Sequence, residues 1–306
     1  MLFRSRGVLI GSIVFVFGSF ILLIGMLVYE SYKSKQMREL AMSIPTEARP
    51  VAKAAAQDFS MYKTKVGDEG REMVQIPAGP FTMGSNDGDP DEAPERQVFL
   101  KGYFIDRYEV TQDEYLRFAK MTKRQFPRIE VFEDDQSKVL KPELAAMSVS
   151  WDDAVAYCKW AGKRLPTEAE WEKAGRGEGK RKYPWGDKFL NGTANVDGPE
   201  DGYKYLAPPG SFEAGRSPYG LHDMTGNVAE WVADTYDENY YRKGGYRDPK
   251  GPDEGDLKVV RGGSWRETEQ NARLSKRFAA KHWRNDITIG IRCASDLEPS
   301  GEAAGQ

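Results

Sequence analysis

Residues 162–172 read Gly-Lys-Arg-Leu-Pro-Thr-Glu-Ala-Glu-Trp-Glu and carry the clearest local structural signal in the chain. Thr167 and Glu170 stand three residues apart ahead of Trp171, which is the spacing of a capping box. In that motif each side chain bonds the other residue's backbone N–H and so starts a helix. Gly175 follows as a helix stop. The stretch therefore predicts a short helix that begins after Thr167 and ends at Gly175.

Two more helices are predicted from their first residues. Thr111 and Glu114 form a second capping box. Ser150 can cap a helix over residues 151–161, which Gly162 would end.

The predicted strands are all short, and the middle of the chain shows little periodicity. The strands cover residues 73–76, 81–83, 97–100, 103–105, 259–261 and 287–293. Residues 182–258 are dominated by Gly, Asp, Asn, Pro and Tyr. A loop-rich stretch this long inside a compact domain is commonly functional or held by ions. Short elements joined by long loops predict an α+β fold of low regular secondary structure.

Composition excludes two classes of function. The 306 residues contain 44 Lys and Arg against 47 Asp and Glu, so no basic excess is present to bind nucleic acid. Two cysteines and two histidines do not supply the ligands of a common zinc module in any plausible spacing.

The N-terminus differs from this average. Residues 7–29 contain no charged side chain, and about 20 apolar residues span a bilayer as a helix. The run is long for a cleavable signal peptide and apolar all round, which favours an uncleaved transmembrane signal anchor over a buried core helix. We therefore predict an anchor in residues 1–29, a juxtamembrane helix and stalk in 30–72, a globular domain in 73–296 and a disordered tail in 297–306.

Motifs along the globular part occur in a family-specific order. They lie at residues 73–85, 91–94, 108–111, 149–151, 156–158, 162–172, 183–186, 219–231, 261–265 and 290–294. Together they resemble the formylglycine-generating enzyme (sulfatase-modifying factor) family over about three quarters of the chain. The resemblance implies a C-type-lectin-like α+β fold (the FGE-sulfatase fold) and a domain that works outside the cytoplasm.

The resemblance also implies a specific chemistry that this sequence departs from. The family's enzymes oxidise a sulfatase cysteine to formylglycine, with copper held by two cysteines shortly after the Gly-Gly-Ser-aromatic motif. Aligned on residues 262–265, Glu267 and Ala272 stand at those two positions. Copper(I) prefers thiolate ligands, so neither copper nor formylglycine formation is expected. Cys158 and Cys293 match the family's structural disulfide instead; the alternative is two unrelated buried thiols.

Calcium is the cofactor that the resemblance implies. Carboxylate, amide and carbonyl oxygens are the ligands that Ca²⁺ prefers. One site matches Asn195, the Val196 carbonyl, Asp201 and the Tyr203 carbonyl; the other matches Asp223, the Gly226 and Val228 carbonyls and Glu230. The alternative is that Asp223 and Glu230 only cap turns.

Glu267 is the candidate catalytic residue if the chain is an enzyme. A cysteine-less branch of the family matures the siderophore pyoverdine by oxidation, and a buried carboxylate could act there as a general base. The alternative is a surface carboxylate paired with Arg266 or Arg273.

A cluster of aromatic residues is the candidate partner surface. Tyr236, Tyr240 and Tyr241 stand beside Arg242 in a loop rich in Gly and charge. Aromatic rings with Arg suit protein or sugar contacts. The alternative is a loop that packs its own tyrosines.

We therefore predict a non-catalytic binding or scaffolding domain. It would be an accessory subunit of a membrane or envelope protein complex, with residues 7–29 in the bacterial inner membrane. The N-terminus would be cytoplasmic and the domain periplasmic, although Lys33, Lys35 and Arg38 weaken the charge argument from Arg4 and Arg6. The alternatives are a cysteine-independent oxidative tailoring enzyme and a calcium-dependent, lectin-like ligand binder.

Overall fold

A computed structural model describes residues 58–126 and 136–297, all within one compact unit. The first sheet has the order β1 (Thr64–Val66), β2 (Glu72–Ile76), β5 (Tyr103–Asp106) and β10 (Ala294–Asp296), and every pair in it is antiparallel. Strand β1 lies in the segment predicted as a stalk, so the sheet begins before residue 73.

Two further groups of strands complete the β-structure. Strands β3 (Gly79–Met83) and β4 (Arg96–Leu100) form an antiparallel ribbon. The last sheet has the order β8 (Phe278–Lys281), β7 (Leu257–Arg261), β6 (Ala229–Thr235) and β9 (Ile289–Gly290). Strands β6 and β9 are parallel, and the other pairs in this sheet are antiparallel.

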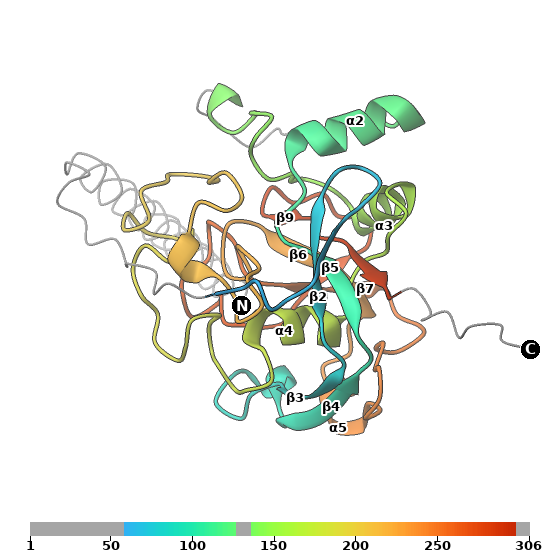
Figure 1. The fold of residues 1–306 in the computed structure, drawn as a ribbon, viewed down its shortest axis with the longest axis vertical. Coiled ribbons are helices and arrows are strands. Elements are labelled where there is room, and N and C mark those ends of the chain that lie inside the picture. The colour runs from blue at the N-terminus through green and yellow to red at the C-terminus, as the bar shows by residue number, and fades with distance from the viewer. Residues whose placement is uncertain (1–57, 127–135, 298–306) are drawn as a thin grey trace, which may run out of the picture. The chain divides into compact units, whose positions relative to one another are not determined.

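The three helices predicted in the described residues begin where the sequence predicts, and one short helix was not predicted. Helices α2 (Gln112–Thr122) and α4 (Glu168–Arg176) both start with complete capping boxes, and Ser150 caps α3 (Trp151–Trp160). A short α5 spans Tyr240–Lys243, and 3-10 turns lie at Pro90–Glu92, Gln136–Lys138 and Glu213–Gly215. Helix α4 contacts β3, β4, β6 and β7, so it lies between the ribbon and the last sheet (Figure 1).

Helix α4 continues past its predicted stop. Gly175 is inside the helix because it packs against Leu274: an added Cβ would lie 2.4 Å from Leu274 Cδ2. Gly177, with a φ of 74°, caps the helix instead. The glycine at 175 therefore permits close packing, and the turn comes two residues later.

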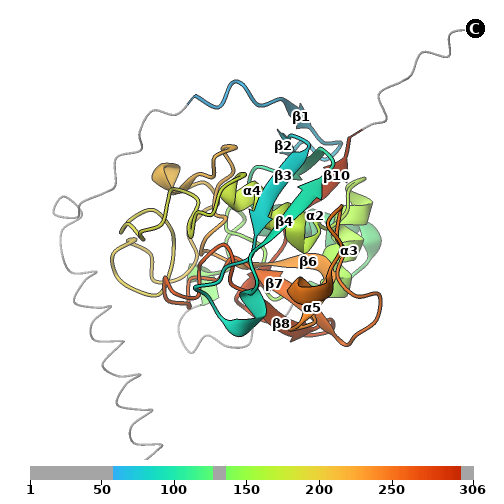
Figure 2. The same cartoon turned by 90° about the horizontal axis from the view of Figure 1, so that it is seen from below.

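Two strands of the last sheet, β6 and β8, were not predicted. In β6, Trp231 and Val232 are neighbours and both are fully buried, so the strand lacks the alternation of a half-exposed strand. The predicted strand over residues 287–293 is reduced to the two residues of β9, and β10 begins just after it. The α+β class and the low content of regular structure are as predicted, with long loops gathered on the side away from α3 (Figures 1 and 2).

The predicted location needs a correction. Within residues 58–126 and 136–297, no helix is both long enough and apolar enough to cross a bilayer. This finding counts against a single-pass inner-membrane protein with a periplasmic domain, and that prediction is withdrawn. The predicted anchor (residues 1–29), residues 30–57 of the predicted juxtamembrane helix and stalk, and residues 298–306 of the predicted tail lie outside the described residues.

Candidate functional site

The two cysteines of the chain are bonded to each other. Cys158 on α3 and Cys293, just before β10, form a disulfide with their Cα atoms 5.6 Å apart, and both residues are fully buried. Because the sequence contains only these two cysteines, no thiolate remains to bind a copper ion. The pairing that the resemblance implies is the one that the structure contains.

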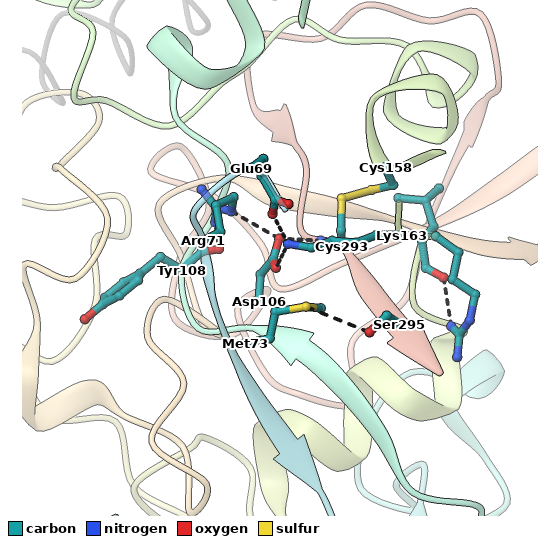
Figure 3. Close-up of a disulfide and its surroundings, with 11 residues drawn as sticks. Glu69, Arg71, Met73, Asp106, Tyr108, Cys158, Lys163, Cys293 and Ser295 are labelled. Atoms are coloured by element: carbon teal, nitrogen blue, oxygen red, sulfur yellow. Dashed lines mark hydrogen bonds and ion pairs between the residues drawn. A yellow bond between two sulfur atoms is a disulfide. The ribbon is translucent and has the colours of Figure 1, made fainter. Parts of the chain in front are cut away.

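A buried charge cluster surrounds this disulfide (Figure 3). The Lys163 ammonium donates to Asp106 Oδ1 at 2.6 Å and also to Glu69. Arg71 donates to Asp106 Oδ2 at 3.2 Å, and the same oxygen accepts a hydrogen bond from the Cys293 backbone N–H. The segment just after α3 is therefore bonded to the first sheet beside the disulfide, through the ion pair of Lys163 with Asp106.

Glu267 lines a pocket. A cavity of about 240 Å³ is lined by Glu267 and Ser264 together with the Arg284–Asp286 ion pair and apolar residues of β7 and β8. Glu267 is half-buried, and its carboxylate accepts a hydrogen bond from the Asn271 amide at 2.8 Å.

Neither predicted arginine partner pairs with Glu267. The Arg273 guanidinium bonds Glu92, and Arg266 lies over the Trp265 ring, 5.5 Å from its centroid. The simple surface ion pair is therefore not what holds Glu267 in place.

Ala272 lies in the core. It is fully buried with Ala194 and Val196. Gly263 passes so close that a Cβ there would lie 2.9 Å from Ala272 Cα. A larger side chain at position 272 would have to displace these neighbours.

The first predicted calcium set comes together in one loop. Asn195 donates through its amide to the Tyr205 carbonyl and to Asn227 Oδ1, at 2.8 and 3.0 Å. Its own Oδ1 is buried and has no hydrogen-bond partner among the described residues. Asp201 accepts from the backbone N–H groups of Val196 and Tyr203, at 3.0 and 2.8 Å. A buried amide oxygen without a donor is a group that a hard cation could satisfy.

The second predicted calcium set is organised differently. Glu230 is fully buried and accepts from Arg292 through both oxygens, at 2.8 to 3.0 Å, and from the Trp171 indole at 2.6 Å. Asp223 accepts from the Gly210 N–H, and burial raises the pKa of its carboxyl to about 6. Because Arg292 already balances Glu230, this set fits a calcium ion less well than the first.

Two residues of this region were missed by the sequence analysis. Arg292 is one, and Glu109 is the other: its carboxylate accepts from the Val228 N–H, and burial raises its pKa well above the usual range. Glu109 and Val228 stand 119 residues apart, so no local pattern pairs them. In the part of the chain that the structure describes, no group of three or more His, Cys, Asp or Glu side chains is placed to hold a metal.

The predicted aromatic surface is mostly internal. Tyr241 is buried and bonds Glu168 and Glu172, while Tyr236 and Tyr240 pack against the core. Only Arg242 of the four predicted contact residues is exposed. The tyrosines of this loop therefore pack inward, as in the alternative to a partner surface given above.

Comparisons with known proteins agree with the fold. Residues 58–297 match the Sulfatase-modifying factor enzyme 1-like domain (FGE-sulfatase). The chain is 34% identical over 277 residues to the mouse (Mus musculus) protein named Inactive C-alpha-formylglycine-generating enzyme 2, covering 73% of this chain and 85% of that one. It is 33% identical over 299 residues to the Formylglycine-generating enzyme of Thermomonospora curvata, covering 78% and 98%.

A solved structure is similar as well. PvdO from Pseudomonas aeruginosa superposes with a TM-score of 0.66 at 29% identity, covering 77% of this chain and 98% of that one. The family match spans the described domain, and the relatives include one named a formylglycine-generating enzyme and one named inactive. This chain belongs to the sulfatase-modifying factor enzyme 1-like (FGE-sulfatase) family.

Proposed function

We propose that this chain is a non-catalytic member of its family that serves as a binding or accessory subunit of a protein complex. One observation carries the proposal: both cysteines are consumed by a buried disulfide. Copper(I) chemistry of the family's kind needs soft thiolate ligands. A carboxylate at Glu267 and a methyl group at Ala272 do not replace them. The likeness to a relative named inactive supports the same conclusion.

Formylglycine formation is the direct test. We expect the purified domain, supplied with copper and a sulfatase-type cysteine peptide, to form no aldehyde above background. The aldehyde would be detected by mass spectrometry after trapping with a hydrazide. The Thermomonospora curvata enzyme, run in parallel, is the positive control. Aldehyde formed by this chain at a comparable rate would refute the proposal.

A second candidate rests on the pocket at Glu267. Its carboxylate is held by Asn271 rather than neutralised by an arginine, and it faces a cavity beside Ser264. This arrangement supports a cysteine-independent oxidative enzyme in which Glu267 takes up a substrate proton. The test uses a strain from which the gene for this chain has been deleted. A Glu267→Gln variant that folds and joins its complex normally, but does not restore the phenotype that the wild-type chain restores, would favour this candidate. Full restoration would favour the binding role.

We also propose a structural calcium ion at the first set, held by Asn195, Asp201 and the carbonyls of Val196 and Tyr203. The buried Asn195 Oδ1 supports it, because an amide oxygen without a donor is costly inside a protein. The second set is not proposed as a calcium site, because the Glu230 carboxylate is already ion-paired with the Arg292 guanidinium.

Calcium is expected to raise the melting temperature. At about 100 times the Kd, binding to the native state adds about 2.7 kcal/mol, which is roughly 5–10 °C for a domain of this size. Calorimetry with calcium and with EDTA measures the shift. Asp201→Asn should abolish it, whereas the exposed Glu254→Gln should leave it unchanged. An equal shift in both variants, or no shift in the wild type, would contradict the proposed site.

A further inference from the structure

A second, larger pocket lies apart from Glu267 and from both calcium sets. It has a volume of about 700 Å³, and none of its lining residues lines the pocket at Glu267. Its walls come from the end of β4, one face of α3, the start of α4, β6 and the loop around residue 248. Cavities of roughly 300–1,000 Å³ are the size of small-molecule sites.

Charge is distributed unevenly around this pocket. Five cationic side chains line it, namely Lys101, Lys159, Lys163, Arg164 and Lys250, against the three acids Glu170, Asp248 and Asp296. Arg164 is paired with Glu170 and Asp296 at 2.7 and 2.8 Å. Lys163 is paired with Asp106 and Glu69 outside the pocket.

Two of the cations remain uncompensated. Lys159 and Lys250 are exposed, and neither ammonium has a carboxylate within ion-pair distance among the described residues. Lys101 forms an ion pair with Asp296, with its Nζ 3.6 Å from Asp296 Oδ1. Asp248 is the one lining acid that has no ion-pair partner among the described residues, and it accepts a hydrogen bond from the Lys101 backbone N–H at 2.9 Å. The unpaired charges on the pocket wall are therefore two ammonium groups against one carboxylate.

The interior of the pocket is apolar and rigidly held. Leu100, Trp151, Val155, Leu165 and Ala233 line it. The Trp151 indole is oriented by a hydrogen bond to the Val232 carbonyl at 2.8 Å. The Cys158–Cys293 disulfide, drawn in yellow in Figure 3, joins two parts of the pocket wall. It connects helix α3, which carries Val155, to the segment at β10, which carries Asp296. Side chains held in this way lose little entropy when a ligand binds.

We propose that this pocket binds a small organic anion with a flat apolar body, such as an aromatic carboxylate or sulfonate. The apolar walls and Trp151 take the body, and Lys159 and Lys250 take the anionic group. The volume suits a single small molecule rather than a protein segment. The proposal goes beyond the proposed function, because it concerns different residues and holds whether or not Glu267 is catalytic.

Anilinonaphthalene sulfonate is the probe for this site, with the uncharged phenylnaphthylamine as its matched neutral analogue. We expect saturable, one-to-one binding of the sulfonate by fluorescence titration of the full chain, and binding of the neutral probe at least about tenfold weaker. The double variant Lys159→Glu/Lys250→Glu should weaken sulfonate binding at least about tenfold and leave the neutral probe unaffected, because charge reversal acts only on the anion.

Two controls separate this site from general binding. Lys63→Glu/Lys188→Glu reverses two exposed lysines outside the pocket and should leave the sulfonate affinity unchanged. Val155→Phe fills the cavity and should weaken both probes, with near-ultraviolet circular dichroism confirming that each variant is folded. Equal sulfonate affinity in the two double variants would overturn the proposal. Equal binding of the two probes by the wild type, or unchanged binding by folded Val155→Phe, would do so too.

Discussion

Arg292→Met is expected to cost about 3–5 kcal/mol of the free energy of unfolding, the usual cost of removing one partner of a buried ion pair. Arg292 is fully buried and is bonded to Glu230, to the His222 carbonyl at 2.8 Å and to the Asp106 carbonyl at 3.0 Å. Without it, Glu230 would be a buried charge among two other buried carboxyl groups, Glu109 and Asp223. Urea unfolding of the purified domain measures the loss.

The cost should depend on burial and on charge. Arg117→Met removes an exposed partner of Asp113 and should change stability by less than about 1 kcal/mol. Adding Glu230→Gln to Arg292→Met should restore part of the loss, since the stranded charge is then gone. A loss below about 1 kcal/mol for Arg292→Met alone would contradict this account of the ion pair.

The same unfolding measurement, repeated with added calcium, tests whether a cation binds beside Glu230. If Glu230 is balanced by Arg292 alone, added calcium should not rescue Arg292→Met more than it stabilises the wild type. Selective rescue would show that a cation can replace the guanidinium beside Glu230, and would return calcium to the second set. The variant therefore reports on the site as well as on stability.

Local signals account for what the sequence predicts well. The capping boxes at Thr111 and Thr167 involve residues three positions apart, so the sequence alone contains both partners. The strands of the β3–β4 ribbon were likewise predicted to within two residues at their first positions. Where one short segment contains all of the determining contacts, the pattern is sufficient.

Long-range contacts explain what was missed. Arg292 and Glu230 lie 62 residues apart, and the burial of β6 on both faces removes its alternation. Tyr241 was predicted to lie on a contact surface, yet its hydroxyl lies beside Glu168 and Glu172 of α4. These pairings are made by the packing of α4 against the sheets and leave no trace in a local window.

The lysine-lined pocket is the clearest case of this kind. Lys159 and Lys250 are 91 positions apart by their numbers, and each alone is an ordinary exposed lysine. Only the fold brings α3 next to the loop around residue 248. Composition gave no hint of such a site, since the net charge of the whole chain is -3.

Replacing both cysteines, as Cys158→Ala/Cys293→Ala, is expected to lower the free energy of unfolding by about 4–5 kcal/mol in the chain-entropy account of disulfides. The bond closes a loop between residues that are 135 positions apart, so it removes many conformations from the unfolded chain. Thermal unfolding and urea titration measure the loss.

A reductant gives the matched control for that variant. Wild-type protein unfolded with a strong thiol reductant should approach the stability of the alanine variant, whereas the variant itself should be insensitive to the reductant. Both residues lie in the apolar core around Tyr157 and Trp231, so part of any loss comes from the missing sulfur atoms. Reduced wild type keeps both sulfur atoms, so the difference between oxidised and reduced wild type isolates the cross-link. A difference near zero would contradict the chain-entropy account of this cross-link.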